Sequence, residues 1–382
     1  MQCTIQQLFE RHFGAFTAKH KIALHQWKAA RSLTQCRTAA LGGHVRRCEQ
    51  GHIDGVWYNS CRHRWCPNCN ALASERWLSA QRARLLKCAH RHLVFTLPSE
   101  LRLLFRFNES VLSDALFDAV RETMVTLLGD ERYLGATPGM ILARHTWGRN
   151  LAYHPHIHCL VSEGGLDRAG QWRSPKRASI LLPARVVMRL YRGKLRAKVL
   201  ALVDAEQLTL PSGQTPARLR RALNRLGRLP WHVYVGERYT HGDGVAVYLA
   251  RYVRGGPLGK RQLSVNSAGQ HTLHYTRHRR DTEGPRRAKL HLSADELIGR
   301  ILTHVPVHRK RIVRSYGLYA SGCKGKLNQA REALGQEAVL AEAPIQWTAF
   351  IQHHQPQSLK CRRCGAPIHL GEAIGRNRGP PR

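Results

Sequence analysis

Two histidines and two tyrosines carry the spacing that most suggests chemistry in this chain. His156 and His158 are two residues apart in an apolar run, and in a β-strand the side chains at i and i+2 share one face. Two imidazoles on one face can bind one metal ion. Tyr248 and Tyr252 are four residues apart, so in a helix their phenol oxygens lie side by side. The sequence therefore offers a cation site and a pair of hydroxyl nucleophiles.

These groups suit transesterification of a phosphodiester. A tyrosine hydroxyl has an ordinary pKa near 10, so at neutral pH it needs help to lose its proton and to approach a negatively charged phosphate. A divalent cation held by His156 and His158 would polarise the scissile phosphate and orient it for in-line attack. The phosphotyrosine ester retains the bond energy, so strands can be rejoined without ATP. A second tyrosine permits a second cleavage while the first DNA end is still held.

The third ligand of this ion is not visible in the sequence. Positions i and i+4 of a strand are about 13 Å apart, so His154 cannot join His156 and His158 on one ion. We expect His154 to support the site or to contact DNA. Four residues remain as candidates for the third ligand: His145, Glu163, Glu237 and Asp243.

The cysteines predict a structural zinc site near the N-terminus. Cys66-Pro67-Asn68-Cys69 is a tight turn that places two thiolates on one zinc ion. Cys48 and Cys61 complete an all-sulfur set, with His52 and His63 as alternative ligands. A second pair, Cys361 and Cys364, is half a site. It either carries no metal or is completed by one of His353, His354, His369 and Cys323.

The charge balance indicates a polyanionic partner. The chain has 382 residues, with 61 Lys and Arg against 25 Asp and Glu, and a formal net charge of +36. The excess is distributed over the sequence rather than confined to a tail, which places basic surface on the folded body and favours DNA. No signal peptide and no run of eighteen apolar residues occurs, so we expect a cytoplasmic, nucleoid-associated protein.

The periodicity of apolar residues predicts an α+β fold in which an antiparallel sheet is flanked by helices. A small zinc-binding domain precedes it. Strands 138–146 and 154–163 are expected to pair as a hairpin, and Ser293 with Glu296 forms a capping box. The remaining expected strands are 92–98, 231–235 and 273–276. The expected helices are 5–16, 100–130 with possible interruptions, 184–205, 217–226 and 293–302.

Three domains follow from these elements. Residues 1–90 would form an N-terminal helix and a zinc-binding DNA-contact domain, and 91–320 the catalytic domain. Residues 321–382 would form a basic C-terminal extension that contains the second cysteine pair and is partly disordered.

The order of these motifs resembles one family. Tyr58-Asn59-Ser60-Cys61 precedes the cysteine turn, Thr146-Trp147-Gly148 precedes the histidines, and Tyr248-Leu249-Ala250-Arg251-Tyr252-Val253 precedes Gly256-Pro257. This order is similar to that of the insertion-sequence-ninety-one family of rolling-circle transposases, which are of the HUH, two-tyrosine type. The likeness spans about residues 41–317. It departs from the family pattern at Gly51-His52, where a second cysteine often stands, and within Arg314-Ser315-Tyr316-Gly317.

The resemblance implies an HUH-type sheet and a metal-dependent DNA strand transferase. Tyr248 and Tyr252 would attack single-stranded element ends to give a 5′-phosphotyrosine and a free 3′-hydroxyl. His156 and His158 would hold Mg²⁺ or Mn²⁺, although two imidazoles alone also accept zinc or nickel. Structural zinc would bind Cys48, Cys61, Cys66 and Cys69. The chain has no GxxxxGK[ST] loop, so a host helicase would unwind the DNA.

Two other functions fit part of the pattern. A plasmid or phage replication initiator, or a conjugative relaxase, would share the histidine and tyrosine chemistry. A non-catalytic zinc protein that binds DNA would use these residues only for packing. The zinc motif and Gly255-Gly256-Pro257 favour the transposase over the initiator.

Overall fold

The structure is a computed structural model that describes residues 2–176, 181–240, 256–259, 262–276, 286–307, 310–340 and 343–376. Tyr248 and Tyr252, with the helix expected to carry them, lie outside these residues. The same holds for Asp243, a candidate metal ligand.

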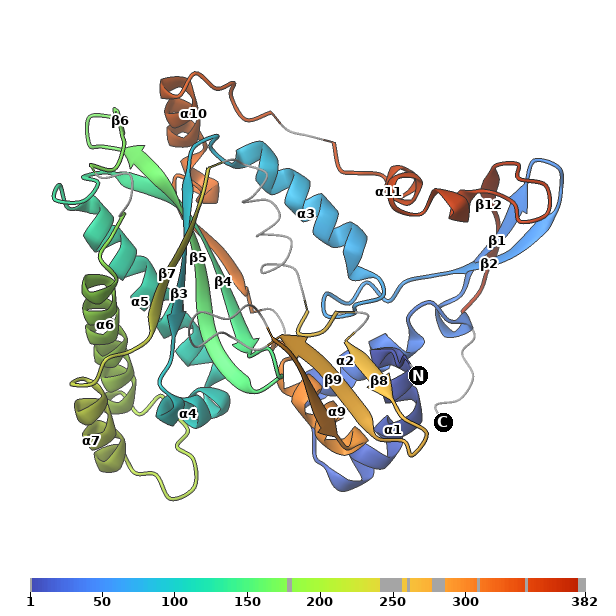
Figure 1. Cartoon of the computed structure of the whole chain (residues 1–382), viewed down its shortest axis with the longest axis horizontal. Coiled ribbons are helices and arrows are strands. Elements are labelled where there is room, and N and C mark those ends of the chain that lie inside the picture. The colour runs from blue at the N-terminus through green and yellow to red at the C-terminus, as the bar shows by residue number, and fades with distance from the viewer. Residues whose placement is uncertain are drawn as a thin grey trace.

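A central antiparallel sheet organises the chain (Figure 1). Its strand order is β11-β4-β5-β3-β7, and a short strand, β6, pairs with β5. The expected hairpin is confirmed, because β4 (Thr137–Trp147) pairs antiparallel with β5 (Tyr153–Leu166). Both strands are buried along nearly their whole length. The other strands are β3 (His90–Thr96), β6 (Trp172–Arg173), β7 (Val233–Tyr239) and β11 (Val313–Gly317).

Helices cover one face of this sheet with an apolar core. The odd-numbered β5 residues Ile157, Cys159 and Val161 face α5 (Glu109–Gly129) and α6 (Ala184–Asp204) in one buried cluster. The short helices α4 (Arg102–Phe107) and α7 (Pro216–Leu226) extend the same layer. The helical stretch expected over residues 100–130, with possible interruptions, is interrupted at Asn108 between α4 and α5. Its side-chain amide donates to the carbonyl oxygens of Leu104 and Thr209, and its oxygen accepts from the Thr209 backbone N–H.

The opposite face carries the even-numbered residues of β5. Its apolar part packs against α3 (Asn70–Arg84), α10 (Lys324–Ala333) and the side chain of Tyr319. At one end of this face the apolar residues give way to histidines, His156 and His158. Two helical layers on a largely antiparallel sheet confirm the predicted α+β class.

The N-terminal helices pack on a segment far away in the sequence. α1 (Ile5–Lys19) and α2 (Leu24–Gln35) share a buried cluster with α9 (Ala294–Thr303) and with the sheet β10-β9-β8. The predicted capping box at Ser293 and Glu296 is confirmed at the start of α9. The strands are β8 (Leu263–Val265), β9 (His271–Thr276) and β10 (Arg287–Leu292).

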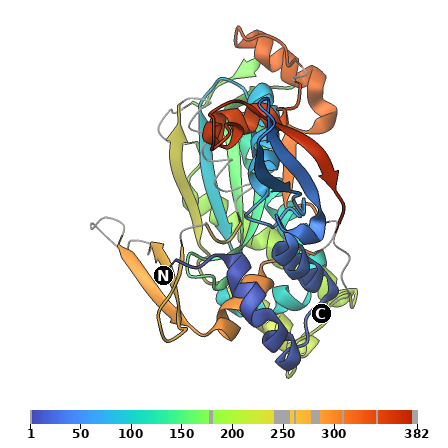
Figure 2. The same ribbon diagram turned by 90° about the vertical axis from the view of Figure 1, so that its right-hand side faces the viewer.

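A third sheet joins the two ends of the chain. β1 (Gly43–Cys48) pairs with β2 (Ile53–Tyr58) and, on its other side, with the C-terminal strand β12 (Ile368–Ile374). Figure 2 shows β12 running beside this hairpin. Residues 343–376 of the expected C-terminal extension therefore pack on the β1–β2 hairpin, through α11 (Trp347–His354) and β12.

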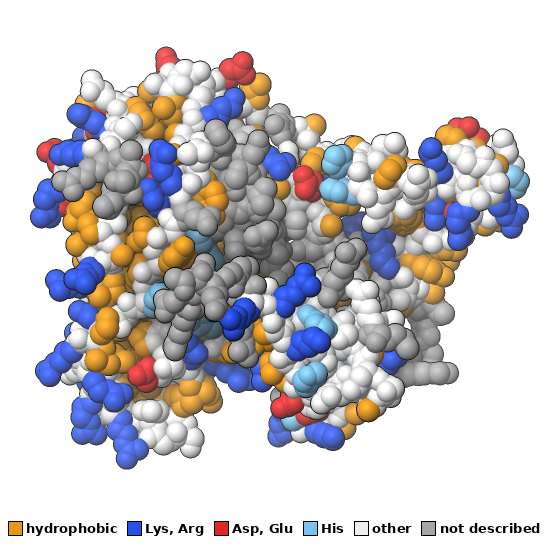
Figure 3. Space-filling model, viewed as in Figure 1, with side chains coloured by type: hydrophobic (Ala, Val, Ile, Leu, Met, Phe, Trp, Pro, Cys, Tyr) orange, Lys and Arg blue, Asp and Glu red, His pale blue; other side chains and the backbone are white. Residues whose placement is uncertain are grey.

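The surface agrees with the charge balance. Figure 3 shows Lys and Arg side chains over all parts of the visible face, with Asp and Glu far fewer. Among the described residues, no helix combines the length and the apolar character needed to cross a membrane.

A buried hydrogen-bond chain beneath the sheet gives a test of the fold. The Tyr319 hydroxyl donates to His90 Nε2 at 2.6 Å and accepts from the Leu86 N–H at 3.2 Å. Tyr319→Phe leaves both partners buried and unpaired, so we expect the free energy of unfolding to fall by about 1–3 kcal/mol. The buried Tyr153 hydroxyl has no partner among the described residues, and Tyr153→Phe should be neutral or stabilising. Urea denaturation measures both variants, and equal losses would contradict the assignment.

His90 makes the stability depend on pH. Burial lowers the pKa of His90 to about 4, whereas in the unfolded chain it titrates near 6.5. The unfolded state therefore binds the proton first, so the contribution is complete above pH 6.5 and is lost as the pH falls toward 4. Between pH 7.5 and pH 5 we expect His90 to account for roughly 2 kcal/mol of lost stability. Urea titrations in EDTA should show a pH dependence smaller by that amount in His90→Gln; an unchanged pH dependence would contradict it.

Candidate active site and metal centres

Three histidines meet on the histidine-bearing face of the central sheet. His145 on β4 lies directly opposite His156 on β5, and His158 follows two residues along the same strand. One ring nitrogen from each lies within 4.8 Å of the others, in an arrangement that can hold a metal ion. His145 is thus the candidate third ligand that the fold brings to the predicted pair.

The hydrogen bonds of the rings aim their remaining nitrogens at one point. His156 Nδ1 donates to the backbone carbonyl of His154 at 2.6 Å, which leaves the Nε2 lone pair free to bind a cation. His158 Nδ1 lies 3.0 Å from His92 Nε2 on β3. The Nε2 atoms of His156 and His158 are 3.0 Å apart. Adjacent ligands of an octahedral ion at 2.1 Å are separated by about 3.0 Å, which matches this distance.

Burial keeps the imidazoles of His156 and His158 in the neutral form that a metal needs. His145, His156 and His158 are 6%, 8% and 7% exposed. Desolvation, and next the neighbouring His145, hold the pKa of His158 well below its ordinary value, and the pKa of His156 is lowered in the same way. Burial also lowers the pKa of His92 to about 4. His156 and His158 therefore offer uncharged nitrogen donors to a metal ion.

The aromatic neighbours fix His145. Its ring stacks on Trp147 with centroids 4.4 Å apart and planes 14° apart.

His154 takes part through its backbone carbonyl, and its ring is outside the ligand group. His92 was not singled out in the sequence, since only the β5-β3-β7 strand order shows that it borders His158.

Glu163 has a different role from the one considered in the sequence. It lies on the opposite face of the sheet with its side chain 2% exposed, and its carboxylate pairs with Arg91 at 2.6 Å and with Arg238 at 2.5 Å. These two guanidinium groups neutralise a buried charge and tie β5 to β3 and β7. Glu163 is thus not a ligand of the histidine site. The Glu237 side chain lies outside the described part of the structure.

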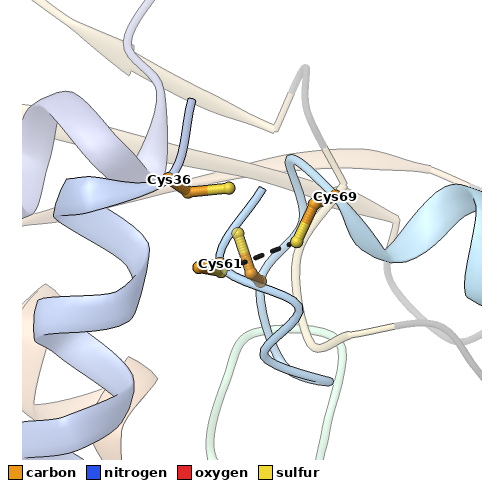
Figure 4. Close-up of side chains that lie close together, drawn as sticks. Cys36, Cys61 and Cys69 are labelled. Atoms are coloured by element: carbon orange, nitrogen blue, oxygen red, sulfur yellow. Dashed lines mark hydrogen bonds between the residues drawn. The ribbon is translucent and has the colours of Figure 1, made fainter. Parts of the chain in front are cut away.

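The N-terminal cysteine set differs from the expected one by one ligand. Cys61, Cys66 and Cys69 meet Cys36, which follows α2, and not Cys48 (Figure 4). Cys61 Sγ and Cys69 Sγ are 3.6 Å apart, close to the roughly 3.8 Å between sulfurs on a tetrahedral zinc. Cys36 was missed because it is an isolated cysteine that only the packing of α2 brings to the turn. His63 accepts a hydrogen bond from the Trp65 N–H and is not in this group.

Cys48 belongs to a second group. The β1–β2 turn places it beside His52, and the C-terminal pair Cys361 and Cys364 completes four possible ligands. Cys48 is the last residue of β1, so the length of the β1–β2 hairpin separates it from the Cys36 group. In the described residues, the other candidates for the C-terminal pair are not in the group: His353, His354, His369 and Cys323.

A groove of about 2340 Å³ runs between α3, the segment after β2, and the C-terminal residues around α11. Trp57 and Trp347, both in its lining, stack on each other with centroids 5.3 Å apart, and the Arg37 guanidinium lies 5.4 Å from the Trp57 ring. Its basic lining includes Arg62, Arg64, Arg76, Arg84 and Lys324. Aromatic faces beside guanidinium groups are typical of surfaces that bind nucleic acid.

Comparison with known proteins identifies the family. Residues 8–97 match the family model "Transposase zinc-binding domain" and residues 139–326 match "Putative transposase". The chain is 32% identical to "Putative transposase y4qJ" of Sinorhizobium fredii over 97% of its own length and 94% of that protein. The chain belongs to the insertion-sequence-ninety-one (IS91) transposase family. A second relative of this IS91 transposase is the "Transposase for insertion sequence element IS801" of Pseudomonas savastanoi, 31% identical over 89% of this chain and 82% of the relative.

The two family matches cover different sites of this IS91-family transposase. The zinc-binding match contains Cys36, Cys61, Cys66 and Cys69, whereas the other match contains the three histidines. Among solved structures, the conjugative relaxase TrwC with oriT DNA covers 42% of this chain and 70% of its own at 14% identity, with a TM-score of 0.25.

Metal binding by the histidine cluster can be measured directly. His145→Ala removes one of three ring donors, so we expect Mn²⁺ affinity to fall by at least about 10- to 100-fold. His154→Ala keeps the backbone carbonyl that orients His156, and its affinity should stay within about threefold. Isothermal titration with Mn²⁺ at pH 7.5 compares the two variants with the parent. Equal affinities in His145→Ala and the parent would exclude His145 as a ligand.

Proposed function

We propose that this IS91-family transposase cleaves and rejoins single-stranded DNA at the ends of its element through a phosphotyrosine intermediate. The observation that supports this most strongly is the buried cluster of His145, His156 and His158, with its ring nitrogens within 4.8 Å. Such a cluster leaves coordination positions open for a phosphate oxygen. A divalent cation there, which we assign as Mg²⁺ or Mn²⁺, would polarise the scissile phosphate.

The protein's own residues prepare this site. His92 and the His154 carbonyl fix the orientation of the two β5 rings, and burial keeps the rings unprotonated. Tyr248 or Tyr252 supplies the nucleophile: its oxygen forms a bond to phosphorus, the bond to the 3′-oxygen breaks, and that oxygen takes up a proton. Reversal of the same step, with another 3′-hydroxyl as attacking group, rejoins the strand. The assignment of these two tyrosines as nucleophiles is supported by their spacing and by the family pattern.

The substrate and its path follow from the charge and the groove. The net charge of +36 attracts DNA from a distance. We assign the groove beside α3 to single-stranded DNA, because its tryptophans can stack on bases while its arginines and Lys324 neutralise phosphates. Zinc on Cys36, Cys61, Cys66 and Cys69 would hold the N-terminal wall of that groove in shape. Unwinding by a host helicase and residence in the cytoplasm on nucleoid DNA complete the proposal.

The transposase assignment separates this chain from replication initiators and relaxases with similar chemistry, because the zinc-binding match is to transposases. A zinc protein that only binds DNA would form no covalent product. The products of one cleavage assay therefore distinguish an enzyme from a binding protein.

The assay uses labelled single-stranded DNA from an element end, incubated with full-length protein and Mn²⁺. We expect a protein–DNA adduct that survives boiling in detergent. Its rate should fall by at least about 100-fold in His156→Ala/His158→Ala, and the adduct should disappear in Tyr248→Phe/Tyr252→Phe. His154→Ala is the matched control and should keep most activity. An undiminished adduct in the double tyrosine variant would refute the nucleophile assignment. A parent protein that binds the DNA but never forms an adduct would refute the catalytic proposal.

A further inference from the structure

We infer that Cys48, His52, Cys361 and Cys364 form a second zinc site, which fastens the C-terminal segment to the N-terminal hairpin. Cys48 Sγ lies 3.7 Å from Cys364 Sγ and 3.5 Å from His52 Nδ1. With zinc–sulfur bonds of 2.3 Å and a zinc–nitrogen bond of 2.0–2.1 Å, tetrahedral geometry requires about 3.8 Å and about 3.6 Å. The four donor atoms already have the spacing of a zinc site.

Each half of the site is a tight turn that presents two ligands. In the first, the Cys48 N–H donates to the His52 carbonyl at 3.1 Å, and the Gly51 N–H donates to the Cys48 carbonyl at 2.9 Å. In the second, the Gly365 N–H donates to the Cys361 carbonyl at 2.8 Å. Gly51 and Gly365 have φ values of 77° and 72°, which only glycine adopts at low cost. Two facing turns of this kind are the arrangement of a zinc ribbon.

The turns are brought together by contacts that need no metal. β12 pairs with β1 so that Ile368 lies opposite Cys48. Asp54 on β2 has a side chain that is only 1% exposed. Its carboxylate accepts from the backbone N–H of Arg362, the residue after Cys361, at 2.9 Å, and pairs with Arg46 at 3.1 Å. This buried carboxylate anchors the second turn against the hairpin.

The donor set selects the metal. Three thiolates and one imidazole in a closed tetrahedron suit zinc and exclude Mg²⁺, which requires oxygen ligands. The site is separate from the Cys36 group, which has its own four sulfurs. The zinc-binding family match ends at residue 97, so it contains Cys48 and His52 but neither of the C-terminal cysteines.

The second zinc has a structural consequence for the groove. Trp347 and Phe350 on α11 line the wall that faces Trp57, and they lie on the chain just before Cys361. The Arg46 guanidinium also donates to the Ser358 carbonyl at 2.7 Å, between α11 and the second turn. Zinc at this position therefore holds the C-terminal wall of the groove in place.

The test counts zinc in the full-length protein. We expect two thiolate-bound zinc ions per chain in the parent and one in Cys361→Ser/Cys364→Ser. Cys323→Ser, which alters a cysteine outside both groups, should keep two. Substitution with Co²⁺ separates these ions from any metal on the histidines, because thiolate ligation gives an intense sulfur-to-cobalt charge-transfer band. That band should lose about half its intensity in the double variant. An unchanged zinc count there would overturn the second site.

Two further measurements distinguish loss of the second zinc ion from misfolding of the variant. Cys364→His replaces one zinc ligand by another at an exposed position, and we expect it to retain the second zinc while Cys364→Ser binds it at least about tenfold more weakly. Trypsin should cut the parent slowly at Lys360, Arg362 and Arg363, and rapidly in the double serine variant. Equal zinc binding by Cys364→His and Cys364→Ser, or equal cleavage of parent and double variant, would contradict the proposal.

Discussion

The register between β4 and β5 is the constraint on which the candidate active site depends. It sets His145 opposite His156 and places His158 one pleat further along the same face. A slip of one residue would turn all β5 histidines toward α5 and α6, and their apolar neighbours toward the opposite face of the sheet. The register is fixed because both faces of β5 are buried, with Ile157, Cys159 and Val161 on the helix side. Packing on one face therefore specifies chemistry on the other.

Whether a site residue could be predicted from the sequence depends on how far along the chain its partners lie. The period of two along a strand identified His156 and His158 and excluded the His154 ring, since these relations lie within one element. The hairpin of β4 and β5 was also predictable, and it left His145 among four candidates for the third ligand. Choosing between these candidates required the register between β4 and β5 and the face of the sheet on which each side chain lies. The register brings His145 to the site. Glu163 is excluded because Arg91 and Arg238 hold it on the opposite face of the sheet.

The cysteines show the same limit more sharply. Cys66 and Cys69 were predictable because a tight turn alone brings two ligands together. Cys61, close to this turn in the sequence, was also predicted correctly. Other members of the two groups come from distant segments: α2 delivers Cys36, and β12 delivers Cys361 and Cys364 to Cys48. Similarly, Asn108 breaks a helix through bonds to the backbone of Thr209. Local patterns predict the elements, whereas the partners of isolated residues depend on tertiary structure.

The pairing of β12 with β1 has a consequence for the order in which the molecule matures on the ribosome. Residues 43–58 emerge early, but they form only a two-stranded hairpin, which is marginal on its own in water. Their third strand, β12, and two of the four possible ligands of the second zinc site, Cys361 and Cys364, are synthesised much later in translation. The sheet that contains β1 and β2 thus gains its third strand only after β12 (Ile368–Ile374) has been translated. A product of premature termination would lack the third strand of this sheet, so the fold itself distinguishes finished transposase from fragments.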